Sequence, residues 1–227
     1  MFRIILIVAF WLTLSPQVVA SELSDTPTRE ELEAWFNDDS DLKVEDVNEG
    51  ELHILEKQGK SVFHSVNRIT ITPDSIDTGW VKVAHCYRNL DAVAEVQVVY
   101  QYKFMRNLKI DSVDGINKAW VEGQSVQLQG VSEKAILCTQ AEARAFYQNE
   151  DGSFTLANGP YQRRFLDGYY PMRVSIDIQY PEKLLRFNNA MPANISQRVK
   201  TDKSGTLVLD IYFEGKLSMK FNFNGKH

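Results

Sequence analysis

Two stretches near the C-terminus, in which apolar and polar residues alternate, constrain the fold of this chain more than any other feature. In residues 172–180 every second side chain is apolar, and those between are Arg, Ser, Asp and Gln. Because successive side chains of a β-strand point to opposite faces, this period of two predicts a half-buried strand. Residues 207–213 and 217–223 repeat the pattern on either side of Glu214-Gly215. We expect a hairpin there, whose apolar faces share one core.

The chain from residue 51 onward reads as further short strands separated by turn signals. Stretches 52–56 and 61–66 flank Gly59 and are expected to pair as a hairpin. The alanines of 135–147 are compatible with a helix, but the turn residues 149–152 and the following stretch favour a hairpin, so we interpret 135–147 as a strand. Other expected strands are 68–72, 80–86, 93–104, 107–113 (ending at the turn signal Asp114-Gly115), 120–122, 125–129, 153–157 and 184–187. The chain is therefore expected to be all-β and mostly antiparallel, as a β-sandwich or a barrel-like fold.

The first twenty residues have the layout of a secretory signal peptide. One positive charge at Arg3 precedes an apolar run, and the small residue Ala20 precedes the polar Ser21. A retained membrane anchor is the alternative, but the run is shorter than the about 20 residues that a span needs. We expect an exported protein, periplasmic or extracellular, with no membrane span in the mature chain.

The domain organisation follows from these patterns. Residues 29–37 have apolar side chains at helical spacing after a possible capping box formed by Thr28 and Glu31, which predicts a short N-terminal helix. The expected regions are a signal peptide at 1–20, a charged linker with this helix at 21–50, a β-rich region at 51–158, and a C-terminal β-sandwich region at 159–227. The last two regions can also form one continuous domain.

Cys86 and Cys138 are the two cysteines of the chain. In an exported protein an even number of cysteines indicates a disulfide. The bond would close a loop of 138 minus 86, or 52, residues. Buried thiols are the alternative only in a reducing compartment.

Charge and motifs exclude several functional classes. A formal net charge of -5 argues against nucleic-acid binding, which needs a surplus of Lys and Arg on one face. The chain contains no Gly-x-Ser-x-Gly motif of serine hydrolases, no His-Glu-x-x-His motif of zinc proteases and no glycine-rich phosphate-binding loop. His53, His64 and His85 have no diagnostic metal spacing, so we assign no catalytic residue, no metal and no cofactor.

The densest group of side chains suited to ligand recognition lies in residues 163–173, in the loop before the strand at 172–180 and at the start of that strand. Its arginines are suited to carboxylate, phosphate or sulfate groups, and its tyrosines to stacking on a sugar or a peptide proline. The alternative is structural: Asp167 and Gly168 form a tight turn, an arginine pairs with Asp167, and the tyrosines cover a sheet edge. The candidate ligand-binding residues are Arg163, Arg164, Asp167, Tyr169, Tyr170 and Arg173.

These observations favour a non-enzymatic protein that binds or scaffolds an envelope glycan or a protein partner through this segment. The alternative is a hydrolase of an envelope polymer that uses dispersed groups such as Asp167 and Asp177 with Tyr169 or His85. Catalysis would require two titratable groups close together in a pocket. A third possibility, a subunit of a larger assembly, would show as an uncovered apolar patch.

Overall fold

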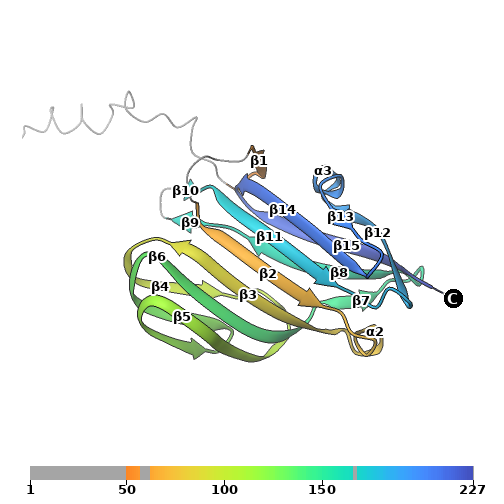
Figure 1. Cartoon of the computed structure of the whole chain (residues 1–227), viewed down its shortest axis with the longest axis horizontal. Coiled ribbons are helices and arrows are strands. Elements are labelled where there is room, and N and C mark those ends of the chain that lie inside the picture. The colour runs from red at the N-terminus through yellow and green to blue at the C-terminus, as the bar shows by residue number, and fades with distance from the viewer. Residues whose placement is uncertain (1–49, 57–61, 166–167, 227) are drawn as a thin grey trace, which may run out of the picture. The chain divides into compact units, whose positions relative to one another are not determined.

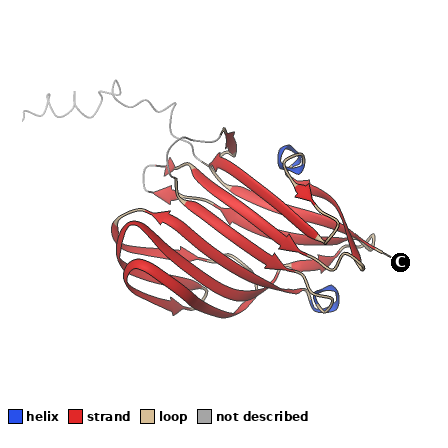
Figure 2. Ribbon diagram, viewed as in Figure 1, coloured by secondary structure: helices blue, strands red, loops and turns tan. Residues whose placement is uncertain are grey.

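The computed structural model describes residues 50–56, 62–165 and 168–226. These residues form mostly antiparallel β-sheets with two short helices, α2 (Ser75–Thr78) and α3 (Ala193–Ser196) (Figure 2). The expected all-β class is therefore confirmed, and the sheets form an open sandwich rather than a closed barrel. The expected signal peptide and the helix at 29–37 lie outside the described residues.

The first sheet contains nine strands within the described residues (Figure 1). Hydrogen bonding connects them in the order β1-β14-β11-β2-β3-β6-β4, with β13 beside β14 and β5 beside β6. Strands β11 and β2 pair in parallel, and the other pairs of this sheet are antiparallel. The strands are β1 (His53–Leu55), β2 (His64–Thr70), β3 (Trp80–Leu90), β4 (Val93–Val99), β5 (Met105–Glu122), β6 (Ser125–Arg144), β11 (Met172–Gln179), β13 (Lys200–Thr201) and β14 (Thr206–Glu214).

The second sheet has four strands in the part of the chain that the structure describes, in the order β12-β15-β8-β7. Its strands are β12 (Leu185–Met191), β15 (Leu217–Gly225), β8 (Phe154–Tyr161) and β7 (Phe146–Gln148). A small separate pair, β9 (Arg164–Phe165) and β10 (Gly168–Tyr169), lies between β8 and β11 in the sequence. The stretch 135–147 is strand as expected, since β6 and β7 account for all of it except Ala145, and β7 forms the expected hairpin with β8.

The expected hairpin of residues 207–223 is wrong, although both of its strands exist. β14 pairs with β1, β11 and β13, whereas β15 pairs with β12 and β8. The turn at Gly215 therefore carries the chain from one sheet to the other. The two apolar faces still share one core, because the two strands contribute to the same buried cluster.

The expected hairpin of residues 52–66 is also wrong. β1 pairs with β14, and β2 is held between β11 and β3. Both edges of β2 are thus occupied by longer strands, which leaves no edge for β1.

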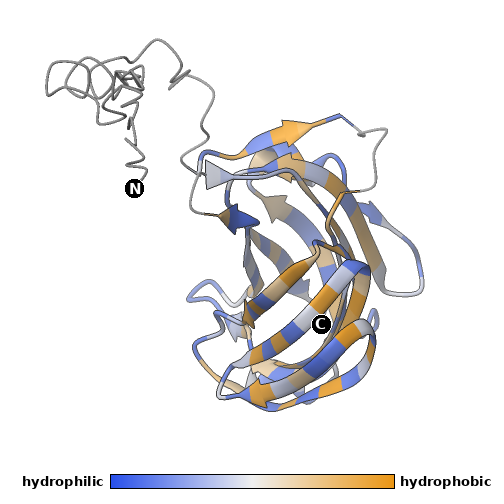
Figure 3. Ribbon diagram, turned by 90° about the vertical axis from the view of Figure 1, so that its left-hand side faces the viewer, coloured by the Kyte–Doolittle hydropathy of each residue, from blue (hydrophilic) through white to orange (hydrophobic). Residues whose placement is uncertain are grey.

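The main core contains the inward side chains of both sheets. Met172, Val174, Ile176 and Ile178 of β11 are all buried, as the alternation predicted, together with Phe213. Figure 3 shows the same alternation of polar and apolar residues along the strands. Each large side chain that is fully removed from water contributes roughly 1.5–3 kcal/mol.

The hairpin of β5 and β6 curls back on itself and encloses a second apolar cluster. β6 is 20 residues long, which corresponds to roughly 66 Å if extended. Its two ends are nevertheless joined through the short segment 100–104: the Tyr100 amide donates to Gln124 O (3.0 Å) and the Arg144 amide donates to Phe104 O (3.0 Å). Five residues span at most about 18 Å, so the hairpin must bend strongly. We call β4, β5 and the N-terminal half of β6 the curl.

Bulges explain the bend of the curl. The pairing of β5 with β6 changes register at several points, one of them between Asp114 and Ile116. Gly115 has a φ of 68°, and a Cβ there would lie 2.5 Å from Ser132 Oγ, so this position requires glycine. The expected turn at Asp114-Gly115 is therefore a bulge within one long strand, not the end of a strand.

The expected disulfide is present. Cys86 and Cys138 are directly opposite each other on β3 and β6, with a Cα–Cα distance of 4.1 Å. The bond closes the chain segment that contains the whole curl.

Candidate functional site

The structure separates the predicted ligand-binding residues into two groups. Arg163, Arg164, Tyr169 and Tyr170 lie on the segment between β8 and β11, which includes β9 and β10. Arg173 lies on β11, on the outer face of the first sheet, where alternate residues point away from the core. Asp167 lies outside the described residues.

Arg163 ties this segment to the bend between β3 and β4. Its Nη2 donates to both carboxylate oxygens of Asp91 (2.8 and 2.7 Å), and its Nη1 donates to Pro171 O (3.3 Å). Its guanidinium also lies 5.4 Å from the ring centre of Phe165. The carboxylate that pairs with Arg163 therefore belongs to a residue 72 positions earlier in the chain, which the sequence did not indicate.

Arg164 is exposed and has no ion pair among the described residues. Its guanidinium lies 5.7 Å from the ring centre of Tyr169, its neighbour across the β9–β10 pair. Stacking on an aromatic ring leaves the N–H edge of a guanidinium available for an anion.

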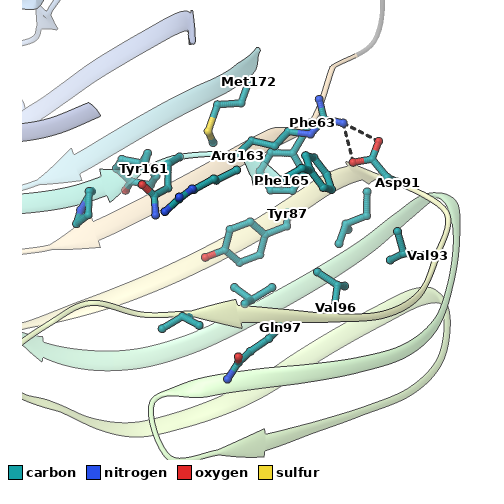
Figure 4. Close-up of a pocket in the computed structure, with 16 residues that line it drawn as sticks. Phe63, Tyr87, Asp91, Val93, Val96, Gln97, Tyr161, Arg163, Phe165 and Met172 are labelled. Atoms are coloured by element: carbon teal, nitrogen blue, oxygen red, sulfur yellow. Dashed lines mark hydrogen bonds and ion pairs between the residues drawn. The ribbon is translucent and has the colours of Figure 1, made fainter. Parts of the chain in front are cut away.

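A pocket of about 230 Å³ opens between this segment and the curl. One wall is residues 160–165, and the facing wall is Val96, Gln97, Val98 and Val99 of β4. Figure 4 shows that the Tyr87 ring projects from β3 into the space between these walls. Drug-sized ligands occupy sites of about 300–1,000 Å³, so this pocket accommodates one ring or one side chain.

The end of the pocket at Tyr87 and Tyr161 adjoins a buried polar cluster. The Tyr161 hydroxyl donates to Asn158 Oδ1 (2.7 Å), and Asn158 Nδ2 donates to the Tyr102 hydroxyl (3.2 Å). The Tyr87 hydroxyl lies 3.5 Å from His85 Nδ1. Burial raises the pKa of Tyr87 and Tyr161 well above 10, so both hydroxyls stay protonated near neutral pH.

His85 is the least satisfied member of this cluster. Its Nε2 is buried and has no hydrogen-bond partner among the described residues. Burial lowers the pKa of His85 from 6.5 to about 4, which keeps the imidazole neutral near pH 7. Sequence reasoning included Tyr161 among the tyrosines suited to stacking but missed Tyr87; the available signal was the spacing of His85 and Tyr87, which places both on one face of a strand.

Arg173 belongs to a separate polar network on the outer face. Its Nε and Nη2 donate to the two carboxylate oxygens of Asp210 (2.8 and 2.6 Å). The Ser175 hydroxyl donates to Asp210 Oδ1 (2.9 Å) and lies 2.8 Å from His64 Nε2. In a catalytic triad the carboxylate orients the histidine, whereas here it contacts the serine and the arginine.

The other dispersed groups considered in the sequence are not brought together. His85 faces the interior, whereas Asp177 lies on the outer face, 3.9 Å from Arg68 Nε. His53 and His64 lie on β1 and β2, which do not pair with each other. Among the described residues, no group of three or more His, Cys, Asp or Glu side chains is arranged to hold a metal ion. No helix in the described ranges is long and apolar enough to cross a membrane.

Comparisons with known proteins assign no family. No family model and no curated protein matches the chain. Among solved structures, the chain is similar to an M1 zinc metallopeptidase from Deinococcus radiodurans, with a TM-score of 0.37 and 11% identity over 78% of this chain and 43% of that one. A variant of that enzyme bound to a Tyr-Ser-Ala substrate gives a TM-score of 0.38 and 9% identity, again over 78% and 43%. The chain thus spans less than half of the length of these proteins, and a likeness this weak assigns no activity.

Proposed function

We propose that the protein is an exported, non-enzymatic binding module, periplasmic or extracellular, that holds an envelope glycan or a protein partner at the pocket beside Arg163 and Arg164. The observation that carries the proposal is the pocket itself. Its walls are mostly apolar, the side chains of Tyr87 and Tyr161 line it, and the exposed cation Arg164 lies at its rim. Such a combination of apolar surface with a few polar groups is typical of binding sites.

The titratable groups of the pocket favour binding over hydrolysis. General acid–base catalysis needs two groups that exchange protons near the operating pH. Among the described residues, Asp91 is the only carboxylate that lines the pocket, and Arg163 occupies both of its oxygens. Tyr87 and Tyr161 have raised pKa values, so neither can act as a base near pH 7.

The structure offers Arg173 as a control for a test of the pocket arginines. Arg163 and Arg173 each form a two-oxygen ion pair with an aspartate and each lie over an aromatic ring, but only Arg163 lines the pocket. The purified protein is immobilised and presented with neutral and anionic envelope polysaccharide fragments and with an extract of envelope proteins.

We expect the Arg163→Ala, Arg164→Ala double variant to lose affinity for the retained material by about 10-fold or more, because arginines are frequent hot spots of binding. Arg173→Ala should retain it as the unaltered protein does. Circular dichroism checks that both variants are folded. Equal retention by the double variant and the control would refute the pocket as the binding site.

A further inference from the structure

The pocket lies along a strand edge that has no neighbour among the described residues. β4 pairs with β6, in the register Val93 with Val131 to Val99 with Ser125, and with no other described strand. β2, the next strand beyond β3, begins at His64 opposite Arg88 and does not extend alongside β4. Among the described residues, no strand pairs with the outward backbone N–H and C=O groups of β4, so this edge can serve as a template for another strand.

The shape of the pocket shows that it follows this edge. Val96, Gln97, Val98 and Val99 are consecutive, yet all of them line it. Because neighbouring side chains of a strand point to opposite faces, a space touched by four consecutive residues lies beside the strand and not over one face. Figure 4 shows Val93, Val96 and Gln97 along one side, with Arg163 and Phe165 on the other.

The edge of β4 has few of the features that normally prevent strand addition; its one charged residue is Glu95, which accepts a hydrogen bond from Gln129 Nε2 on β6 (3.2 Å). Its sequence is rich in valine, contains neither proline nor lysine, and Val99 is 56% exposed. The other edge of the curl is better protected: β5 carries Arg106, Lys109 and Lys118, and its pairing with β6 shifts register at three points between Arg106 and Ile116. Bulges and positive charges are the usual means of blocking an edge, so the two edges of the curl differ in a way that favours pairing at β4.

Charge at the rim indicates what kind of segment fits. Arg163 is neutralised by Asp91, but Arg164 has no carboxylate partner among the described residues. An acidic residue next to an apolar one would place its carboxylate against Arg164 while the apolar side chain enters the pocket. In strand addition, backbone hydrogen bonds supply affinity and pockets for alternate side chains supply specificity.

We propose that the edge of β4 binds an extended segment of a partner protein, with an apolar side chain in the pocket and a neighbouring acidic residue against Arg164. This inference rests on the proposed binding function and selects a protein partner rather than a glycan. The segment pairs with residues of β4, a strand of 7 residues, and only its apolar side chain enters the pocket between β4 and residues 160–165.

The test begins with peptides selected from a displayed library of random linear sequences of about 9 residues, a length typical of strands. We expect the selected peptides to contain an apolar residue next to an acidic one. The Arg164→Glu variant should no longer bind these peptides, whereas the Arg173→Ala variant should bind them with unchanged affinity. A library that yields no peptide would overturn the proposal.

Two isomers of the best peptide then distinguish strand addition from other modes of binding. One is N-methylated at the odd positions of its central part and the other at the even positions. In an added strand only every second N–H group of the peptide faces β4. The affinity of one isomer should therefore fall about 10-fold for each hydrogen bond removed, whereas the other isomer should bind nearly as before. Equal loss in both isomers would overturn the proposal.

Amide hydrogen exchange provides the second measurement. Alternate β4 amides should be unprotected in the protein alone and protected with the peptide bound. Protection of these amides without peptide, or a concentration-dependent dimer that buries β4, would also overturn the inference. Glycan binding that depends on Arg163 and Arg164 but leaves β4 exchange unchanged would leave the proposed function standing and remove only the added strand.

Discussion

The Cys86–Cys138 disulfide should be the largest single contribution to stability that can be removed without changing a core side chain. It joins two directly opposed strand residues and closes a loop of 52 residues that contains the curl. In the chain-entropy model such a loop restricts the unfolded chain by an amount that corresponds to about 4 kcal/mol at 25 °C. For a domain of this size, that is a decrease in Tm of roughly 8–16 °C.

Replacement of both cysteines by alanine tests this value. Thermal unfolding is followed by circular dichroism for the oxidised protein, the protein with dithiothreitol, and the double variant. The reduced protein and the double variant should unfold at nearly the same temperature, and the double variant should be insensitive to dithiothreitol. A Tm that stays within a few degrees of the oxidised protein would refute the reasoning, because it would mean that the unfolded chain is already restricted or that the bond is not formed.

Three further predictions follow from single side chains. Because burial lowers the pKa of His85 to about 4, the unfolded state takes up a proton before the folded state does as the pH falls. The contribution of neutral His85 to the free energy of unfolding is complete above pH 6.5 and decreases by about 3 kcal/mol towards pH 4. His85→Gln should remove this part of the pH dependence of the free energy of unfolding, measured by urea titrations. Phe213→Ala should lower the free energy of unfolding by about 3–5 kcal/mol, because Phe213 is 0% exposed in the main core; a loss below 1 kcal/mol would contradict its placement. A double-mutant cycle on Arg163 and Asp91 should give a favourable coupling of about 0.2–1 kcal/mol, since the pair is partly exposed; a coupling of zero would contradict the contact.

The strands were predictable from the sequence where burial is one-sided. Met172, Val174, Ile176 and Ile178 alternate with polar residues because one face of β11 meets the core and the other meets solvent. The same reasoning identified β14 and β15 as strands. It assigned the wrong pairing to them, because a period of two specifies which face is buried but not which strand lies alongside.

The curl could not be predicted, for a related reason. A glycine with positive φ serves equally in a hairpin turn and in a bulge, and Gly115 proved to be in a bulge. The distinction depends on the partner strand β6, whose continuous pairing is not visible in the local sequence.

The candidate site was predicted in part. The dense group of arginines and tyrosines identified Arg163 and Arg164, which line the pocket, but it also included Arg173, which points to the opposite side of the sheet. Asp91 and Tyr87 could not be found in the same way, because they reach the site from β3 and from the bend after it, far away in the sequence.

By itself the sequence determined that the chain is built of β-strands, which faces of the best strands are buried, and that its cysteines can form a disulfide. These properties depend on local alternation and on side-chain chemistry, which each segment carries with it. Only the tertiary structure decided that β14 and β15 lie in different sheets, that Arg163 pairs with Asp91, and that β4 keeps an edge without a described neighbour. Strand pairing is a choice among many edges of similar hydrogen-bonding capacity, and the packing of the whole core makes that choice.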